Sequence, residues 1–363
     1  MKEMITTTYS RFMPNRCPAT LRGFTLVELL VSMAVLAILL LISANVVSQV
    51  QRTWRNAAQR TSHFREAREA FEAMSNNLKQ ATLNQYEDYD NNSLASANNS
   101  TSSVPTRYLR RSDLHFVCGP TSSLLSGGTY SGQAVFFQMP AGVTFKAQYS
   151  GLNDLLCGRG YFVEINSDAG FRPPFVTKDR IRFRLMEFAP PTEQNLIYSV
   201  VDSNDTGTQR ANKLKKWFAA AGGGVDVNNG VNRPVAENII LLVVSPQTGV
   251  FGQSVSDRVS IAPNYAFDSA MTANTSYADP QGTENTLPPV VRIALVAIDE
   301  TTAEQLEIDG RSSDLLVAVK AGFTNAAKLS DDLSSLADTL VQQKIPFRIF
   351  ERSVAIAGAR DSS

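Results

Sequence analysis

The sequence predicts an α+β protein, in which a long N-terminal helix precedes a mainly antiparallel, β-rich head. An apolar run at residues 24–47 contains one ionisable side chain, and apolar residues then recur at steps of three and four to about residue 83. Beyond Pro105, short apolar stretches alternate with Gly, Pro and Asn clusters, as in antiparallel sheets. The predicted parts are a leader (1–23), a stem helix (24–84), a polar linker (85–104) and the head (105–363).

The apolar run FTLVELLVSMAVLAILLLISANVV is long enough to be a transmembrane helix. At about 1.5 Å per residue it extends about 36 Å, and a bilayer has a hydrocarbon core of about 30 Å. Glu28 is its one ionisable side chain. A secretory signal would have a shorter apolar region ending in small residues at a cleavage site, so a membrane anchor is the better interpretation.

The charge before the span predicts its orientation. Residues 1–23 contain four basic side chains and one acidic side chain, a net charge of +3. Positive flanks stay on the cytoplasmic side of a membrane. We therefore expect a cytoplasmic N-terminus and a head on the opposite side.

The second half of the stem is amphipathic, with charged residues between its apolar positions. Phe64, Phe71 and Leu78 follow one another at steps of seven. Such a stripe forms either a coiled-coil seam against sister stems or the side that packs on the chain's own head. The sequence alone leaves both open.

In the head, residues 180–188 are a candidate strand. From Arg180 to Leu185 arginine and apolar side chains alternate, which predicts one solvent-exposed face and one packed face. Two continuous apolar runs, at 238–245 and 290–298, predict central strands covered on both faces. The other candidate strands are 114–118, 134–139, 160–166, 195–201 and 347–354.

Leucines near the C-terminus and two polar insertions complete the head. Leu329, Leu333, Leu336 and Leu340 have the spacing of an amphipathic helix. The insertions, at 202–235 and 252–289, are rich in Gly, Ser, Thr and Asn. Loops of this length are either functional surfaces or disordered.

The residues GFTLVE, from Gly23 to Glu28, resemble the processing site of type IV prepilins and type II secretion pseudopilins. The resemblance implies that a prepilin peptidase cuts after Gly23 and methylates Phe24. It also implies that Glu28 meets the N-terminal amine of a neighbouring subunit during assembly. Such a partner is physically reasonable, because a lone carboxylate in a membrane helix costs roughly 2.5 to 3.5 kcal/mol. The alternative is that Glu28 lies near the headgroups and is merely tolerated.

The order of stem, linker and head is similar to that of large minor pseudopilins. LPPVVRIAL at 287–295 and AENIILLVV at 236–244 resemble late strands of the J-type members, and large prepilin-like proteins of the Verru_Chthon cassette family are also similar. The implied protein is a minor pilin or pseudopilin of the bacterial inner membrane, at the tip or in the initiating complex. Its implied partners are other pilins or pseudopilins, the prepilin peptidase, the inner-membrane assembly platform and membrane lipid.

Two other functions fit the same stem. In the first, the head is a pilus-tip adhesin or other ligand-binding protein that uses the polar insertions. In the second, the chain is a membrane-tethered enzyme, but no GxSxG, P-loop or GxGxxG pattern occurs. His63 and His115 have no catalytic neighbours in the sequence, so we expect structural roles for both and no enzymatic activity.

The composition and motifs of the chain also argue against several classes of binding function. The 34 basic and 34 acidic residues give a net charge of zero, so we expect no nucleic acid partner. Neither CxxC nor HExxH spacing occurs, and we expect no metal or cofactor. The run from Asp202 to Gly207 begins like a calcium loop, but Lys213 stands where the bidentate glutamate is needed. A plain polar turn is the preferred interpretation.

Cys17 lies in the leader, so Cys118 and Cys157 are the two cysteines of the processed chain. In an oxidising compartment they are expected to form a disulfide. Closing a loop of about 40 residues would stabilise the head by roughly 4 kcal/mol. Two separate buried thiols are the alternative.

Overall fold

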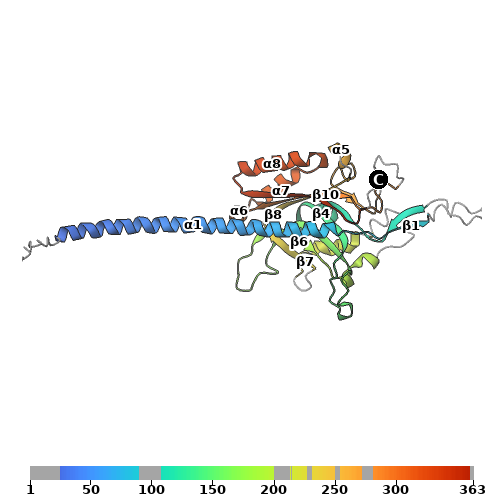
Figure 1. Ribbon diagram of the computed structural model, residues 1–363, viewed down its shortest axis with the longest axis horizontal. Helices are drawn as coiled ribbons and strands as arrows, with labels where there is room; N and C mark the ends of the chain where they lie inside the picture. Colours follow the sequence, from blue (N-terminus) through green and yellow to red (C-terminus); the bar gives the residue numbers. More distant parts are fainter. Residues whose placement is uncertain are drawn as a thin grey trace, which may run out of the picture. The chain divides into compact units, whose positions relative to one another are not determined.

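A computed structural model describes residues 25–89, 108–199, 213, 215–226, 231–249, 254–271 and 281–359. The chain forms two compact units, residues 1–57 and 58–363, and each is described by itself. The boundary falls within helix α1 (Leu26–Lys79), which begins in the first unit and ends in the second (Figure 1). The predicted α+β fold class, a long apolar helix followed by an antiparallel β-rich domain, is confirmed.

In the second unit, the described strands are β1 (Gln85–Tyr89), β2 (Tyr108–Ser112), β3 (Val117–Pro120), β4 (Thr129–Pro140), β5 (Leu156–Ser167), β6 (Ile181–Phe188), β7 (Asn232–Glu237), β8 (Ile239–Gln247), β9 (Phe267–Asp268), β10 (Val290–Ile298) and β11 (Phe347–Ala355). The described helices after α1 are α3 (Thr121–Leu124), α5 (Val255–Arg258), α6 (Glu300–Ile308), α7 (Ser312–Ala321) and α8 (Leu329–Gln342). The 3-10 turns are η1 (Ala147–Tyr149), η2 (Thr192–Gln194), η3 (Leu196–Ser199), η4 (Lys215–Gly223) and η5 (Ala326–Lys328).

The larger sheet has the strand order β7-β6-β5-β4-β3-β9, with antiparallel pairing throughout. Successive side chains of a strand point to opposite faces, so each strand contributes to two cores. On β4, Val135 and Phe137 belong to the main core, whereas Ala134 and Phe136 belong to a second core on the opposite face. The sheet is therefore buried on both sides.

The smaller sheet, β11-β10-β8, is built from the two apolar runs and the last strand. Arg292 of β10 bonds Ser330 of α8, which places α8 on one face of this sheet. Phe350 of β11 is opposite Leu295, on the other face, and its ring lies 6.0 Å from that of Phe71 on α1. Helices thus cover both faces (Figure 1), and β8 also packs on β4 of the larger sheet.

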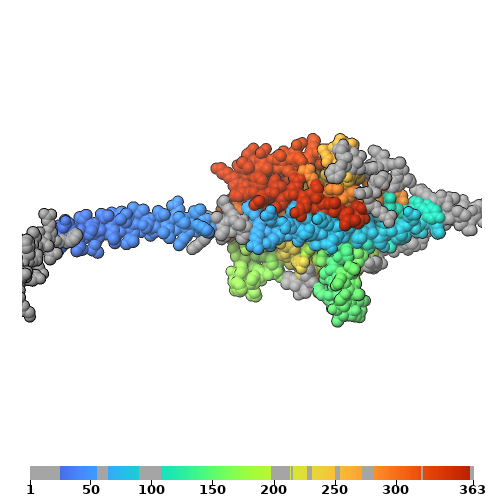
Figure 2. Space-filling view, viewed as in Figure 1, coloured from blue at the N-terminus to red at the C-terminus, as the bar shows by residue number. Residues whose placement is uncertain are grey.

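Within the second unit, α1 packs along the head through one stripe of side chains. Phe71 and Leu78 are buried in the main core, and Phe64 is half-buried against it. The steps of seven therefore mark the side that packs on the chain's own head, one of the two alternatives left open by the sequence. The opposite, charged stripe is exposed, and the space-filling view shows this part of α1 on the surface (Figure 2).

The stem helix was predicted to run to residue 84 but ends at Lys79. The last turn tightens, because the N–H groups of Gln80 and Ala81 bond carbonyls three residues back. The next amide, that of Thr82, donates to the Gln138 carbonyl of β4 at 2.9 Å. Backbone pairing with the sheet has replaced the helical hydrogen bonds.

The linker prediction was wrong in its first five residues, because β1 occupies 85–89 and pairs with β2. The remainder of that segment, 90–104, lies outside the described residues. The strand predicted at 195–201 is also wrong in its described part, which forms η3. Asn195 accounts for this, since its Oδ1 accepts from the Ile197 amide and its Nδ2 donates to Gln138 Oε1.

The second core is closed by η4, part of the first polar insertion. Trp217 and Phe218 are buried, and the Phe218 ring stacks on that of Phe136 at 4.4 Å. The Trp217 Nε1–H donates to His115 Nδ1 at 3.2 Å, while His115 Nε2 lies 2.7 Å from the Asp268 carboxylate. Both ring nitrogens of His115 are engaged, so its observed surroundings fit the structural role expected from the sequence.

Replacing Trp217 by Phe should therefore destabilise the head, because it leaves Nδ1 of a fully buried histidine without its donor. An unsatisfied buried acceptor costs about 1 to 3 kcal/mol. Near-UV circular dichroism of the full chain in detergent would measure the fall in melting temperature. The control is Trp54→Phe, since Trp54 is 74% exposed on α1. Equal melting of both variants would contradict the role of this hydrogen bond.

Candidate assembly site

The first described turn of α1 is a reciprocal cap between Thr25 and Glu28. The Thr25 amide and hydroxyl both donate to Glu28 Oε2 at 3.0 Å. In return, the Glu28 amide donates to the Thr25 hydroxyl at 3.3 Å. This is a capping box, in which the N-cap residue and the third helical residue satisfy each other's backbone amides.

The cap has a consequence for the chemistry of Glu28. Its carboxylate is exposed on the outside of the helix, and within the described residues its own chain holds it through one oxygen, Oε2. Carboxylates accept several hydrogen bonds at once, so further acceptor sites face outward. A positively charged group from a neighbouring chain can approach it without unfolding the helix.

The pattern T-x-x-E was visible in the sequence, although only the carboxylate was singled out there. Thr25 is therefore a site residue that sequence reasoning missed, and the capping-box rule would have found it. Gly23 and Phe24, the predicted cleavage and methylation positions, lie outside the described residues.

The helix beyond the cap is apolar on every side. Residues Leu26–Trp54 form a stretch of 29 residues, whose most apolar 18 residues have a mean hydropathy of 2.7 and are not buried within the protein. Among the described residues this is the one helix long and apolar enough to cross a membrane. A helix that exposes apolar side chains all round requires an apolar environment, which a bilayer supplies.

The arginines of β6 do not form the solvent-exposed face that their alternation predicted. Arg182 and Arg184 are fully buried. Arg182 pairs with Glu307 of α6, and Arg184 Nε donates to Glu237 of β7 at 3.0 Å. The correction has a clear cause, since the carboxylates that neutralise this face come from elements distant in sequence.

The predicted disulfide is wrong in this structure, because Cys118 and Cys157 are free, buried thiols. They lie on β3 and β5, with β4 between them, opposite Val135 and Met139 respectively. Four residues along β4 and two strand spacings put them about 16 Å apart. A disulfide requires Cα atoms within about 7 Å.

Each thiol has its own local partners. Cys118 Sγ lies 3.6 Å from the Tyr265 carbonyl, and Cys157 Sγ lies 3.1 Å from the Thr192 hydroxyl. Burial raises the pKa of Cys118 far above its ordinary value. Since the thiolate is the reactive species, this cysteine is chemically protected in the folded head.

Alkylation should confirm this arrangement. The native full chain, treated with iodoacetamide without reductant, should gain no adduct at Cys118 or Cys157, and after denaturation both should react. Intact mass gives the count, which is two adducts for a chain that has lost Cys17 and three for one that retains it. If both cysteines stayed unreactive after denaturation without reductant, the result would contradict the free thiols and support the disulfide.

Within the described residues, no group of three or more His, Cys, Asp or Glu side chains could hold a metal ion. The calcium-like run from Asp202 to Gly207 lies outside those residues. Of the acidic residues near the start of the linker, Asp88 pairs with Arg111 at 3.2 Å.

Comparison with known proteins bears on the N-terminal segment. Residues 21–44 match the family model of the prokaryotic N-terminal methylation motif. The match includes the capping pair Thr25 and Glu28 and the first half of the apolar helix. Comparisons with curated proteins and with solved structures gave no match.

Proposed function

We propose that this type IV prepilin-like, membrane-anchored protein is a minor pilin or pseudopilin that assembles with related subunits through α1. The observation that carries the proposal is the coincidence of three features at one helix end. They are the methylation motif, the apolar span and an exposed carboxylate held by Thr25. Processing after Gly23 would leave Phe24 at the new N-terminus, four residues before Glu28.

The assembly mechanism follows from the charges. A prepilin cut after Gly23 begins with an amine, and Glu28 is the ionisable side chain within the apolar run. Pairing the amine of one subunit with the carboxylate of the next removes two unpaired charges from an apolar environment. The stems would then bundle within the membrane, while a cytoplasmic ATPase supplies the work.

The size of the head favours a minor subunit. Two sheets, α1 and three further helices of substantial length enclose the main core. A bulky head is difficult to repeat along a tightly packed filament, so a place at the tip or in the initiating complex fits better. The net charge of +3 before the span favours a cytoplasmic leader and a periplasmic or surface-exposed head.

We propose a structural rather than an enzymatic role. His115 is fully buried between Trp217 and Asp268, which leaves it no access to a substrate. The proposed partners are other pilins or pseudopilins, the prepilin peptidase, the inner-membrane assembly platform and lipid. No cofactor is part of the proposal.

The mass of the N-terminal peptide tests the proposal, measured separately in sheared surface material and in membranes of the native host. A peptide that begins at methylated Phe24 in sheared filaments would support a pilus subunit. The same peptide confined to membranes would support a short secretion pseudopilus. A chain that still begins at Met1 in both fractions would contradict the proposal.

A further inference from the structure

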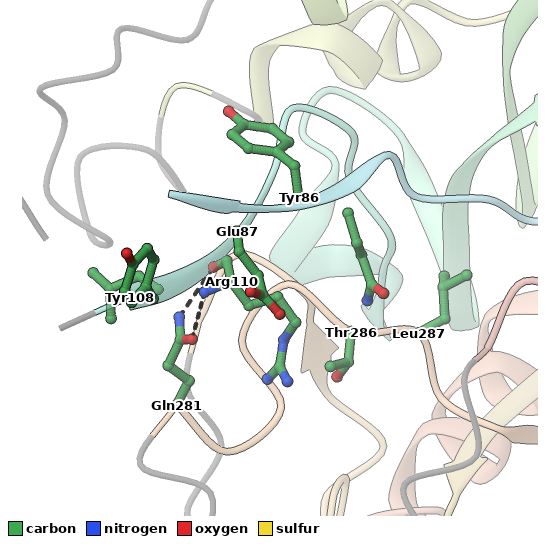
Figure 3. A pocket seen from close by; sticks show the side chains of 9 residues that line it. Tyr86, Glu87, Tyr108, Arg110, Gln281, Thr286 and Leu287 are labelled. Atoms are coloured by element: carbon green, nitrogen blue, oxygen red, sulfur yellow. Dashed lines mark hydrogen bonds between the residues drawn. The ribbon is translucent and has the colours of Figure 1, made fainter. Parts of the chain in front are cut away.

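The ribbon of β1 and β2 forms one wall of a cleft whose other wall is the segment 281–287. The cavity volume is about 680 Å³. Pockets for small ligands typically enclose about 300 to 1,000 Å³. Figure 3 shows Glu87 and Arg110 of the ribbon facing Gln281 and Thr286 across this cleft.

Many hydrogen bonds hold the two walls together. The Arg110 amide donates to Gln281 Oε1 at 2.7 Å, and its carbonyl accepts from Gln281 Nε2 at 3.0 Å (Figure 3). The Arg110 guanidinium donates to the carbonyls of Gly282 and Glu284, at 3.1 and 3.0 Å. A two-stranded ribbon is marginally stable alone, so these bonds fix it and preform the cleft.

Other groups of the same ribbon face are not used in this framework. The Glu87 side chain makes no hydrogen bond or ion pair within the described part of the chain. Further along the face, Tyr89 and Tyr108 pair across the strands with ring centroids 5.4 Å apart. These two tyrosines are 48% and 58% exposed, so a carboxylate and a broad aromatic surface face the solvent side by side.

We propose that this cleft binds a neutral saccharide. A carboxylate accepts hydrogen bonds from adjacent sugar hydroxyls. The Gln85 amide, whose Nε2 donates to the Asn285 carbonyl at 2.6 Å, offers its oxygen as a further acceptor. The C–H face of a sugar ring packs on an exposed tyrosine, whose hydroxyl remains hydrated.

Electrostatics favours a neutral ligand. Glu87 and Arg110 are directly opposite in the ribbon and are the charged residues among the described residues of the lining. Their charges cancel, so the described lining has no net charge to attract an anion or a cation. The Arg110 guanidinium is also engaged by carbonyl groups, which disfavours an acidic sugar, and a basic peptide would meet that guanidinium beside Glu87.

The test uses the full chain in lipid nanodiscs on an array of neutral, sialylated and sulfated oligosaccharides, with hexalysine as a separate cationic probe. We expect binding to neutral oligosaccharides alone. Glu87→Gln and Tyr108→Ala should each weaken it at least tenfold. The first replaces a charged acceptor oxygen by an amide donor, and the second removes the aromatic surface under the sugar ring. The matched controls are Glu304→Gln on α6 and Phe145→Ala, which change an exposed carboxylate and an exposed aromatic ring elsewhere.

Thermal melting of each variant shows whether it remains folded. Three results would each overturn the proposal: no binding by the folded wild-type chain, binding to acidic sugars or hexalysine instead, or binding by both cleft variants as tight as that of the wild type. Incorporation of the same variants into filaments is measured in parallel and should be unchanged. Loss of incorporation therefore reports on the assembly role, and loss of saccharide binding reports on the cleft.

Discussion

Replacing Glu28 by Leu is expected to reduce incorporation of the chain into filaments at least tenfold while leaving it in the membrane. The substitution removes the carboxylate that pairs with a neighbour's amine in the proposed assembly. It also removes an ionised group from the apolar run, which favours membrane insertion by roughly 2.5 to 3.5 kcal/mol. A loss of filament incorporation could then not be attributed to failed insertion.

The measurement is the ratio of the chain in sheared filaments to the chain in membranes, determined by quantitative immunoblotting in the native host. Thr25→Ala is the matched control, because it removes the cap and retains the carboxylate. Loss of an N-cap costs about 1 kcal/mol, which should only fray the first turn. Normal incorporation of Glu28→Leu, or an equal defect in Thr25→Ala, would contradict a specific role for the Glu28 charge.

Local sequence patterns predicted most of the strands that carry the core. The apolar runs at 238–245 and 290–298 became β8 and β10, and β8 is covered on both faces as expected. Only β10 is central, however, because β8 lies at the edge of the sheet β11-β10-β8. Leu329, Leu333, Leu336 and Leu340 are all buried on α8, as their spacing predicted. In each case the hydrophobic period within one segment determines both the element and its buried side.

The arginines of β6 show where this reasoning fails. Because side chains alternate along a strand, Arg182 and Arg184 must share a face. The alternation does not indicate what covers that face. The answer lies on α6, more than a hundred residues later in the chain, where Glu307 reaches Arg182. The alternating arginines were therefore predicted to face solvent, whereas they form a buried ion-pair network.

The prediction of a disulfide between the two cysteines failed for a related reason. Two cysteines in an oxidising compartment suggest a bond, but pairing depends on distance. That distance follows from strand order and register, since β4 separates β3 from β5. Neither can be read from the spacing of Cys118 and Cys157 in the sequence.

The candidate assembly site was the most predictable part of the molecule. Thr25 and Glu28 are three residues apart in one helix, so their contact requires no tertiary information. The cleft between the β1–β2 ribbon and residues 281–287 is the opposite case. It joins segments about 170 residues apart through Arg110 and Gln281, and polar sequence alone gave no reason to place them together.

The ion pair between Arg182 and Glu307 should contribute strongly to the stability of the head. Arg182 is 2% exposed, and its Nε has no hydrogen-bond partner in the described residues. Replacing Glu307 by Ala removes its nearest carboxylate and leaves Glu300, whose Oε1 lies 3.5 Å from Arg182 Nη2, as its remaining partner. Breaking a buried pair costs about 3 to 5 kcal/mol, and the remaining carboxylate puts the expected loss at the lower end of that range.

A loss of about 3 kcal/mol should lower the melting temperature of a domain this large by about 5 to 10 °C. Thermal unfolding of the full chain in detergent measures it, with Glu304→Ala as control, since Glu304 is exposed on the same helix. The double substitution Arg182→Met with Glu307→Leu should recover most of the loss, because an apolar pair can replace a buried ion pair. Equal melting of Glu307→Ala and Glu304→Ala would refute the contribution of the pair.

The same pair predicts how stability varies with pH. Burial raises the pKa of Glu307, but hydrogen bonds from the Ile181 amide and the Arg182 guanidinium, together with the Arg182 charge, lower it below its ordinary value overall. A carboxylate with a depressed folded pKa contributes fully above its unfolded pKa of about 4.3, and the contribution is lost as the pH falls through the folded value. Wild-type melting should therefore fall more steeply below about pH 4.3 than that of Glu307→Gln. Parallel acid profiles for the two proteins would show that Glu307 does not titrate with a depressed pKa, and would remove the electrostatic basis for the pair.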